Sequence, residues 1–451
     1  MGISVRRHGQ ALWRWLLVMD RPVAPKTDDE LDAEMQQNLR WNFTFNVLDG
    51  AFFWLGLSFI STATILPLFV SKISPNPLLI GLLAMIGQSG WYLPQLFTAG
   101  WIEQLPRKKP VVANLGFFTE RLPLFFLPLA ALLAVSHPTW ALIVFFTAFA
   151  AHGLGAGVVA PAWTDLIGRC FPVDLRGRYF GISSFIGTGL GAVGAIYSGR
   201  LLGAYPFPFN FALSFTLAIV FITLSWIFLE LVREPTRPIP DEVVEQRGRS
   251  WRKIRNIVRT DENFRNYLLV RLLAAFGTMA AGFVTVAAIQ RWAIADSQVG
   301  YFTAALLIGQ TLGNLIAGVV ADRHGHRLSL MISISITVTA YLLALVAPSP
   351  VWYNAVFLLM GVGAGMMIVS GVLINLEFSR PEHRPSYVGI ANTTNGVGNM
   401  LAPLIGGLLA AVGYNFLFAA AAGFGILALL IMISVVNEPR RKTEFGPVSA
   451  D

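Results

Sequence analysis

The stretch Gly318-Val-Val-Ala-Asp322-Arg323-His-Gly325-His-Arg327 is a short charged turn between two long apolar runs. Residues 297–321 before it and 328–376 after it contain no Asp, Glu, Lys or Arg. A helix of roughly 20 apolar residues is long enough to cross the hydrocarbon layer of a bilayer. The turn is therefore expected at a membrane surface, between two membrane-spanning segments.

The composition of the whole chain has the same character. Charged residues make up 13% of the 451 residues and hydrophobic residues 55%, whereas ordinary soluble domains carry about 25% charged residues. The apolar runs are uninterrupted and lack the alternation of a membrane β-barrel, so they are expected to be helices. The single Cys170 excludes an intramolecular disulfide, and the sequence predicts no cofactor, no metal site and no nucleic-acid partner.

Twelve spans are predicted by the apolar runs and the polar turns between them. They cover about 42–70, 77–102, 110–134, 139–167, 178–202, 209–232, 264–290, 297–321, 327–347, 350–377, 386–411 and 414–436. The corresponding domains are a cytoplasmic tail (1–41), a six-helix bundle (42–232), a basic cytoplasmic linker (233–263), a second six-helix bundle (264–437) and a cytoplasmic tail (438–451).

The basic residues predict the orientation of this arrangement. If both termini are cytoplasmic, 28 of the 33 Lys and Arg residues lie in cytoplasmic segments, and the outer loops hold only Lys72, Arg200 and Arg291. Such an excess of positive charge on one side is the usual determinant of topology. The asymmetry favours twelve spans with both termini inside.

Two polar segments allow more than one interpretation. In the linker, Trp251, Ile254 and Val258 share one helical face among basic residues, which is typical either of an amphipathic helix on the inner leaflet or of a solvated linker. The apolar stretch 11–19 is too short to span. It is interpreted as a short interfacial helix or a disordered tail.

The two predicted halves contain a repeated segment. Asp174-Leu-Arg176-Gly-Arg178-Tyr-Phe-Gly181-Ile precedes or opens the fifth span, and Glu382-His-Arg384-Pro-Ser-Tyr387-Val-Gly389-Ile the eleventh. The acid, Arg, Tyr, Gly and Ile align without gaps. Parallel six-plus-six repeats are typical of transporters in which the substrate site lies between the repeats at mid-membrane.

The pattern G-x-x-x-D-R-x-G-x-R at 318–327 closely resembles the cytoplasmic loop signature of the major facilitator superfamily of secondary transporters. The first-half equivalent, 100–109, keeps the leading Gly and the terminal basic residues but lacks the Asp-Arg core. The resemblance implies an all-α membrane protein with twelve helices in two pseudo-repeat bundles, alternating access and no enzymatic activity. It also implies a cytoplasmic gate, made of Gly318, Asp322, Arg323, Gly325 and Arg327 against Arg176 and Arg178.

Away from the ends of the predicted spans, four charged residues lie in the inner half or centre of the membrane: Asp49, Glu120, Arg121 and Arg271. A charge at the bilayer centre costs several kcal/mol unless it is paired or hydrated, so these residues are candidates for proton coupling. The first and seventh helices resemble the cavity-lining helices of the superfamily, which favours an Asp49–Arg271 pair. Adjacent residues 120 and 121 are not expected to share a helical face, and Arg121–Asp49 is the alternative pair. Ion pairs that merely tie helices together are equally consistent with the pattern.

Neutral polar side chains at membrane depth are candidates for a substrate cavity or, singly, for hydrogen bonds between helices. They are Asn46, Gln88, Tyr92, Gln95, Asn114, His152, Gln310, Asn314, Asn392, Asn395 and Asn399. Few charges and many aromatic residues favour a neutral or amphipathic substrate.

The sequence thus predicts a secondary transporter that exports a small amphipathic compound in exchange for protons, as a monomer in the plasma membrane. The alternatives are a proton symporter that imports a sugar or organic acid, and a transporter-like protein for lipid handling or the assembly of membrane complexes.

Overall fold

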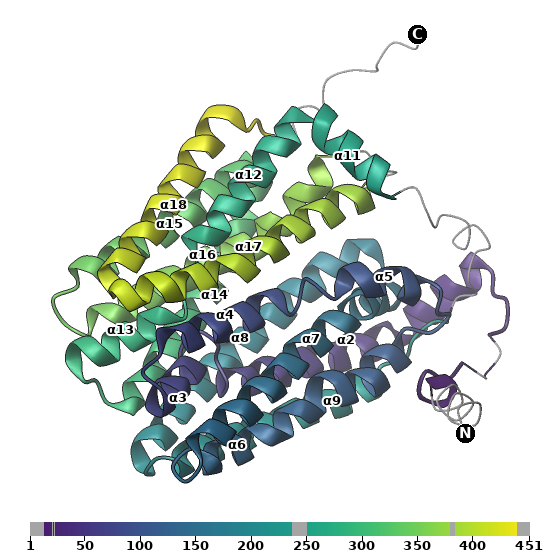
Figure 1. Ribbon diagram of the computed structural model, residues 1–451. Coiled ribbons are helices and arrows are strands. Elements are labelled where there is room, and N and C mark those ends of the chain that lie inside the picture. The colour runs from purple at the N-terminus through teal and green to yellow at the C-terminus, as the bar shows by residue number, and fades with distance from the viewer. Residues whose placement is uncertain (1–12, 20, 22, 237–249, 379–383, 440–451) are drawn as a thin grey trace, which may run out of the picture. The chain divides into compact units, whose positions relative to one another are not determined.

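The computed structural model describes residues 13–19, 21, 23–236, 250–378 and 384–439, and all regular structure among them is helical (Figure 1). Eight long apolar helices are continuous: α7 (Pro138–Cys170), α8 (Val173–Ala204), α9 (Phe209–Glu230), α14 (Asp296–His324), α15 (His326–Val346), α16 (Trp352–Glu377), α17 (Arg384–Val412) and α18 (Tyr414–Val435). A ninth, over Val111–Leu133, is irregular. All nine are long enough to cross a membrane and agree with nine of the predicted spans.

The other three predicted spans are each broken into two helices. The first consists of α2 (Asp28–Ser58) and α3 (Ile65–Ile73), the second of α4 (Pro77–Ser89) and α5 (Gln95–Glu103), and the seventh of α12 (Glu262–Gly277) and α13 (Phe283–Trp292). The first and seventh spans hold equivalent places in the two halves, so the break is itself repeated. Irregular backbone at membrane depth requires burial in protein, and Phe59, Thr64 and Met279 at these breaks are almost fully buried.

The irregular span contains two π-helical segments, η1 (Val111–Leu115) and η2 (Phe117–Arg121), then the 3₁₀ segment η3 (Leu122–Phe126) and α6 (Leu127–Leu133). Pro123 and Pro128 lack the backbone donor that a regular helix would need at their positions. π-Helical turns occur frequently at functional sites, and this one carries Glu120 and Arg121.

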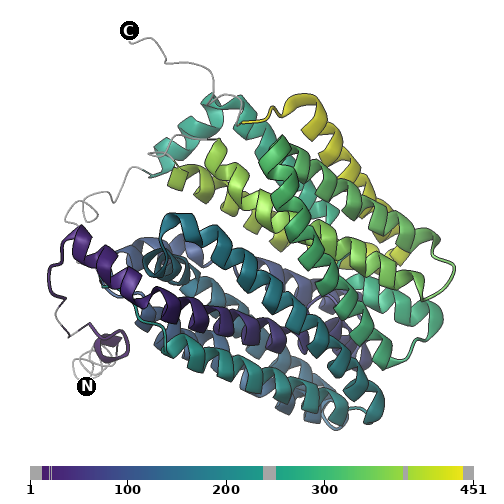
Figure 2. The ribbon, with the colours of Figure 1, turned by 180° about the vertical axis from the view of Figure 1, so that it is seen from behind.

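Helix α2 begins fourteen residues before the predicted span. Thr27 and Glu30 form a capping box, in which the Thr27 N–H donates to Glu30 Oε2 (2.8 Å) and the Glu30 N–H donates to Thr27 Oγ1 (3.3 Å). Three acidic residues in the first turn also favour a helix start here. Part of the predicted cytoplasmic tail is therefore helical; Figure 2 shows α2 in purple.

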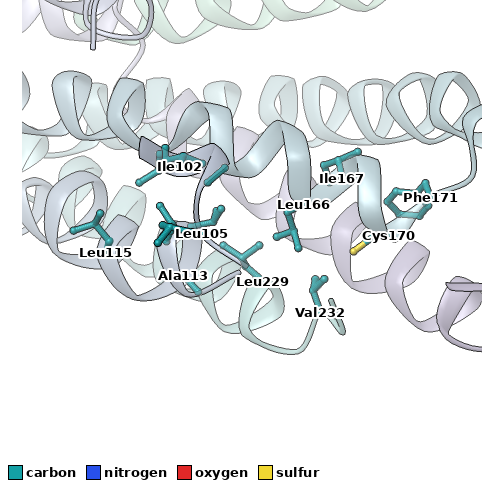
Figure 3. Packing of buried hydrophobic residues seen from close by; sticks show 14 of the residues in the cluster. Ile102, Leu105, Ala113, Leu115, Leu166, Ile167, Cys170, Phe171, Leu229 and Val232 are labelled. Carbon is teal, nitrogen blue, oxygen red and sulfur yellow. The ribbon is translucent and has the colours of Figure 1, made fainter. Parts of the chain in front are cut away.

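The described chain divides into two compact units. The first comprises residues 1–57, 90–190 and 207–248, and the second residues 58–89, 191–206 and 249–451. Figure 3 shows part of the core of the first unit, where Ile102, Leu166 and Leu229 meet from α5, α7 and α9. The second unit thus includes three segments of the predicted first half: α3, α4 and the end of α8.

These three segments are tied to the C-terminal helices inside the second unit. Lys72 Nζ pairs with Asp296 Oδ2 at 2.8 Å, and the hydroxyl oxygens of Thr64 and Thr303 lie 2.6 Å apart. Gly199 and Gly300 are in such close backbone contact that a Cβ on Gly300 would overlap the Gly199 Cα. These contacts tie α3, α4 and the end of α8 to the C-terminal helices within the second unit, and Lys72 and Asp296 both lie in predicted outer loops.

An asparagine clamp occurs in both sequence halves, each within its own unit. Asn42 Nδ2 donates to the Arg233 carbonyl, and the Arg233 N–H donates to Asn42 Oδ1, both at 2.9 Å. Asn263 and Asn437 make the same two bonds, at 3.0 and 2.7 Å. The clamps connect the first helix of each half to the chain just beyond its sixth helix.

A Glu-Pro pair follows each clamp, and its carboxylate binds the loop of the repeated signature. Glu234 accepts hydrogen bonds from the N–H groups of Lys108 and Lys109 (2.8 and 2.9 Å) and pairs with Arg169 at 3.0 Å. Glu438 accepts from the Arg327 N–H at 3.0 Å. Burial raises the pKa of the Glu234 carboxyl, and its hydrogen-bond donors act in the opposite direction.

The last basic residue of each loop signature donates hydrogen bonds to the backbone carbonyls at the end of a helix. Lys109 Nζ donates to the Glu230 carbonyl at the end of α9 (2.5 Å), and Arg327 Nη2 donates to the carbonyls of Met432 and Ile433 in α18 (3.0 and 2.9 Å). Both cations therefore satisfy carbonyls that the helix end leaves without partners. The first-half loop keeps this function although it lacks the Asp-Arg core.

Candidate functional site

The polar cluster of the first unit is built around Asp49, which lies on α2 and is 7% exposed. The Ser225 hydroxyl on α9 donates to Asp49 Oδ1 at 2.6 Å. Glu120 and Arg121 lie close enough to the Asp49 carboxyl to interact with it electrostatically. Three separate stretches of the first unit thus meet at one buried carboxylate.

Glu120 and Arg121 pair with each other, with 3.0 Å between Arg121 Nη1 and Glu120 Oε2, and both are 5% exposed. The two adjacent side chains therefore meet, although they were not expected to share a helical face, and the Arg121–Asp49 pair stays a prediction. The two long side chains curl toward each other from η2, whose π-helical bonding differs from a regular α-turn. Arg121 Nε has no hydrogen-bond partner among the described residues.

His152 on α7 joins this cluster through the backbone of η2. Its Nδ1 lies 2.8 Å from the Glu120 carbonyl oxygen, and the side chain is 8% exposed. Because a carbonyl can only accept, this bond requires the proton on Nδ1, and in the neutral imidazole Nε2 is then an acceptor. Close approach of the two segments depends on Gly155, where a Cβ would overlap the Thr119 carbonyl oxygen.

Arg271 belongs to the second unit, on α12, and is 8% exposed. Its Nη1 lies 3.0 Å from Met367 Sδ on α16, and its Nε has no hydrogen-bond partner among the described residues. A buried guanidinium without a counter-charge is costly. The Asp49–Arg271 pair joins residues of different units and stays a prediction.

The candidate cavity residues have varied surroundings. Asn46 is fully buried and donates to the Asn42 carbonyl of its own helix (2.8 Å), and Gln95 donates to Trp91 in the same way (2.5 Å). Gln310 is buried, whereas Gln88, Tyr92, Asn314, Asn392, Asn395 and Asn399 are half-buried. Asn114 differs from the expectation, because it donates to the Leu16 carbonyl of the N-terminal segment (2.8 Å). The substrate lining stays a prediction.

Several of the predicted gate residues make hydrogen bonds or close packing contacts within their own unit. Arg176 donates to the carbonyls of Phe171 (3.0 Å) and Gly168 (2.6 Å), which caps the end of α7. Gly325 has a φ of +90°, and a Cβ there would overlap the Glu438 carboxylate. The exposed residues are Arg178, Asp322 and Arg323. A latch between Asp322 and the fifth helix stays a prediction, and Glu382 of the repeated segment lies outside the described residues.

The comparison with protein families agrees with this duplicated architecture. A family model described as Major Facilitator Superfamily matches residues 48–291 and, a second time, residues 267–450. The chain belongs to the major facilitator superfamily. It is therefore an integral, multi-pass membrane protein with the twelve-helix fold of this superfamily, whose members are transporters and not enzymes.

Two curated relatives from the superfamily are drug-resistance proteins. Multidrug resistance protein 1 of Bacillus subtilis (strain 168) is 26% identical over 178 residues, which are 39% of this chain and 46% of that protein. Quinolone resistance protein NorA of Staphylococcus aureus (strain Mu50 / ATCC 700699) is 26% identical over 162 residues, which are 34% of this chain and 39% of that one. The chain spans less than half the length of either relative.

Among solved structures, the crystal structure of a D-xylose-proton symporter is similar, with a TM-score of 0.68 at 13% identity. The match covers 88% of this chain and 98% of the symporter. At this identity the likeness shows the fold of the superfamily and leaves the substrate open.

Asn-Phe and Glu-Pro are the signals that sequence reasoning missed. Asn42-Phe43 lies within α2 and Asn263-Phe264 in the first turn of α12, and Glu234-Pro235 and Glu438-Pro439 follow the clamps. Phe43 contacts Tyr179, and Phe264 contacts Tyr387. The repeated tyrosines thus pack against the repeated Asn-Phe pairs.

Proposed function

We propose that this member of the superfamily is a proton-coupled exporter of a small amphipathic or drug-like organic compound, working by alternating access. The observation that carries the proposal is the buried Asp49 cluster, in which a carboxylate with one hydroxyl donor lies beside an ion pair and a histidine. A carboxylate in such a site can bind and release a proton as its access to water changes.

The compound class rests on two further observations. The names of the two relatives, a multidrug resistance protein and a quinolone resistance protein, support a drug-like organic compound as the substrate. The predicted spans contain few ionisable residues and many aromatic ones. This composition favours an amphipathic ligand. Arg271, which contacts a thioether, could receive an acidic group of such a ligand if it is not paired with Asp49.

The proposal is tested with purified protein in proteoliposomes. Compounds, including a quinolone and a permanently charged amphipathic dye, are first screened for thermal stabilisation of the protein. We expect a stabilising compound to accumulate inside vesicles whose interior is acidic, because outward proton flow would drive its uptake. A one-unit pH gradient supports about tenfold accumulation for one-to-one exchange.

The same assay separates the alternatives. A proton symporter, the activity named for the structurally similar xylose carrier, would accumulate its substrate only when the outside is acidic. A protein for lipid handling or complex assembly would show no gradient-driven flux of any stabilising compound. Either result would contradict the proposal.

We also propose that both termini face the cytoplasm of the plasma membrane, on the basis of the basic residues. Single cysteines in a Cys170→Ser background, placed at Arg323 and at Ser349, test this with a membrane-impermeant maleimide on intact cells. We expect labelling at 349 and protection at 323. Labelling of 323 from outside would refute the orientation.

A further inference from the structure

The groove beside the N-terminal segment has a volume of about 520 Å³ and belongs to the first unit. Its lining includes Arg14 and Arg21 of the N-terminal segment together with the aromatic residues Phe117, Phe118 and Trp226. Phe117 and Phe118 lie in η2 and Trp226 in α9, near the cytoplasmic ends of the spans in the proposed orientation. The groove therefore combines a basic rim with an aromatic wall.

The N-terminal segment is held firmly against the protein. Leu17 is 5% exposed and belongs to the same buried cluster as Ile102 and Leu166. The Leu16 carbonyl accepts from Asn114, and Arg107 Nη1 donates to the carbonyls of Val18 (3.1 Å) and Arg21 (2.7 Å). Leu17 is thus packed against the protein, so the described part of the segment is not a free tail, whereas its contact with lipid stays a prediction.

The aromatic wall is rigid as well. Trp226 Nε1 donates to the Ala113 carbonyl (2.9 Å), and the rings of Trp226 and Phe117 lie 4.8 Å apart. Phe118 is 53% exposed, and Trp13 and Trp15 on the N-terminal segment are 50% and 72% exposed. Tryptophans exposed at the end of membrane spans are typical of the interface between lipid and water.

We propose that this groove binds an anionic phospholipid of the cytoplasmic leaflet. The guanidinium groups of Arg14 and Arg21 would receive the phosphate, and the aromatic wall would contact an acyl chain. Basic pockets between transmembrane helices on this side of the membrane bind anionic head groups, and guanidinium matches phosphate geometry. The apolar wall favours a lipid over a free anion, which would gain nothing from it.

A lipid in this groove would contact the same two segments, η2 and α9, that also interact with the Asp49 carboxylate. Phe117 and Phe118 share η2 with Glu120 and Arg121, and Trp226 follows Ser225, the partner of Asp49. Occupation of the groove would therefore stabilise η2 and α9, which supply the neighbours of the buried Asp49 carboxylate. This consequence depends on the proposed function, whereas lipid binding itself does not.

The test uses full-length, delipidated protein in detergent. Phosphatidylglycerol is titrated against phosphatidylcholine, with the midpoint of thermal unfolding as the readout and retained lipid counted by native mass spectrometry. We expect phosphatidylglycerol to stabilise the wild type more strongly. Arg14→Gln/Arg21→Gln should raise its half-saturating concentration roughly tenfold or more, from about 1 kcal/mol per basic residue near an anionic head group.

Two matched variants make the result specific. Arg40→Gln/Arg265→Gln removes the same charge from exposed positions outside the groove and should leave the titration unchanged, whereas the arginines of α11 (Ser250–Thr260) are themselves candidates for contact with anionic lipid. Arg14→Lys/Arg21→Lys keeps the charge and should retain most of the affinity. Both arginines are exposed, so the variants are expected to fold.

Three outcomes would overturn the proposal. Equal stabilisation by phosphatidylcholine would exclude recognition of the head-group charge. An equal loss in Arg40→Gln/Arg265→Gln would show a general charge effect. Full stabilisation by inorganic phosphate alone would identify an anion site without a lipid.

Discussion

Asp49→Asn is expected to abolish the accumulation of substrate that an imposed pH gradient drives. Asn keeps the size of the side chain and can still accept the Ser225 bond, but it cannot bind a proton. About tenfold accumulation under a one-unit gradient should therefore fall to the level without a gradient. The measurement is the proteoliposome uptake assay, with exchange of labelled substrate at equal pH as the second readout.

Exchange at equal pH separates coupling from structure. If Asp49 carries the proton, the Asn variant should still exchange substrate, whereas a merely structural role would reduce both activities together. Glu262→Gln is the matched control, because the Glu262 carboxylate is exposed on the surface and its loss should change neither readout. Undiminished gradient-driven accumulation in both Asp49→Asn and Glu120→Gln would refute the coupling role.

Gly313→Leu is expected to prevent stable folding of the second unit. Helices α14 and α16 make the most extensive contact between described helices, and a glycine seam joins them. Gly309 and Gly313 on α14 face Gly361 and Gly365 on α16, and a Cβ at any of the four would overlap a backbone carbonyl oxygen of the other helix. Backbones can approach this closely only with small residues.

The expected cost is large because a carbonyl on a packed helix cannot move aside. Overpacking a core costs about 1–3 kcal/mol, and more where backbone must shift, so we expect about 3 kcal/mol or more for a leucine. The midpoint of thermal unfolding in detergent and the yield of monodisperse protein measure it. Gly318→Leu on the same helix is the matched control, because a Cβ on Gly318 meets no atom within 4 Å. Equal behaviour of the two variants would contradict the seam.

The duplicated twelve-span fold could be predicted because its signals are simple. Long charge-free runs, the excess of basic residues on one side and the loop signature at 318–327 all follow from the solvent properties of a bilayer. The predicted helix within the linker also exists as α11. Side chains at 250–254 lie outside the described residues, so its contact with lipid stays a prediction.

The breaks and the clamps could not be predicted in the same way. The segments 59–64 and 278–282 are as apolar as their neighbours, so hydropathy does not distinguish a broken span from a continuous one. Asn42 and Arg233 are far apart in the sequence, and a bond between them leaves no periodic pattern. Only the repetition of Asn-Phe and Glu-Pro in both halves could have indicated the clamps.

The candidate site was predicted residue by residue but not in its pairing. Asp49, Glu120, Arg121 and His152 were all identifiable as polar groups at membrane depth. Their arrangement depends on the π-helical geometry of η2 and on the close approach at Gly155, and neither has a sequence signal of its own. Ser225 was missed because a lone serine in an apolar helix usually bonds to its own backbone.

The exchange of protons for an organic compound is tested most directly by the pH inside proteoliposomes. A stabilising, permanently charged amphipathic compound, which cannot carry protons by itself, is added outside at equal pH, and its uptake is followed together with a lumenal pH dye. We predict that the lumen becomes alkaline in step with uptake for the wild type, and not for Asp49→Asn. Acidification, or uptake without any change in lumenal pH, would contradict proton-coupled export.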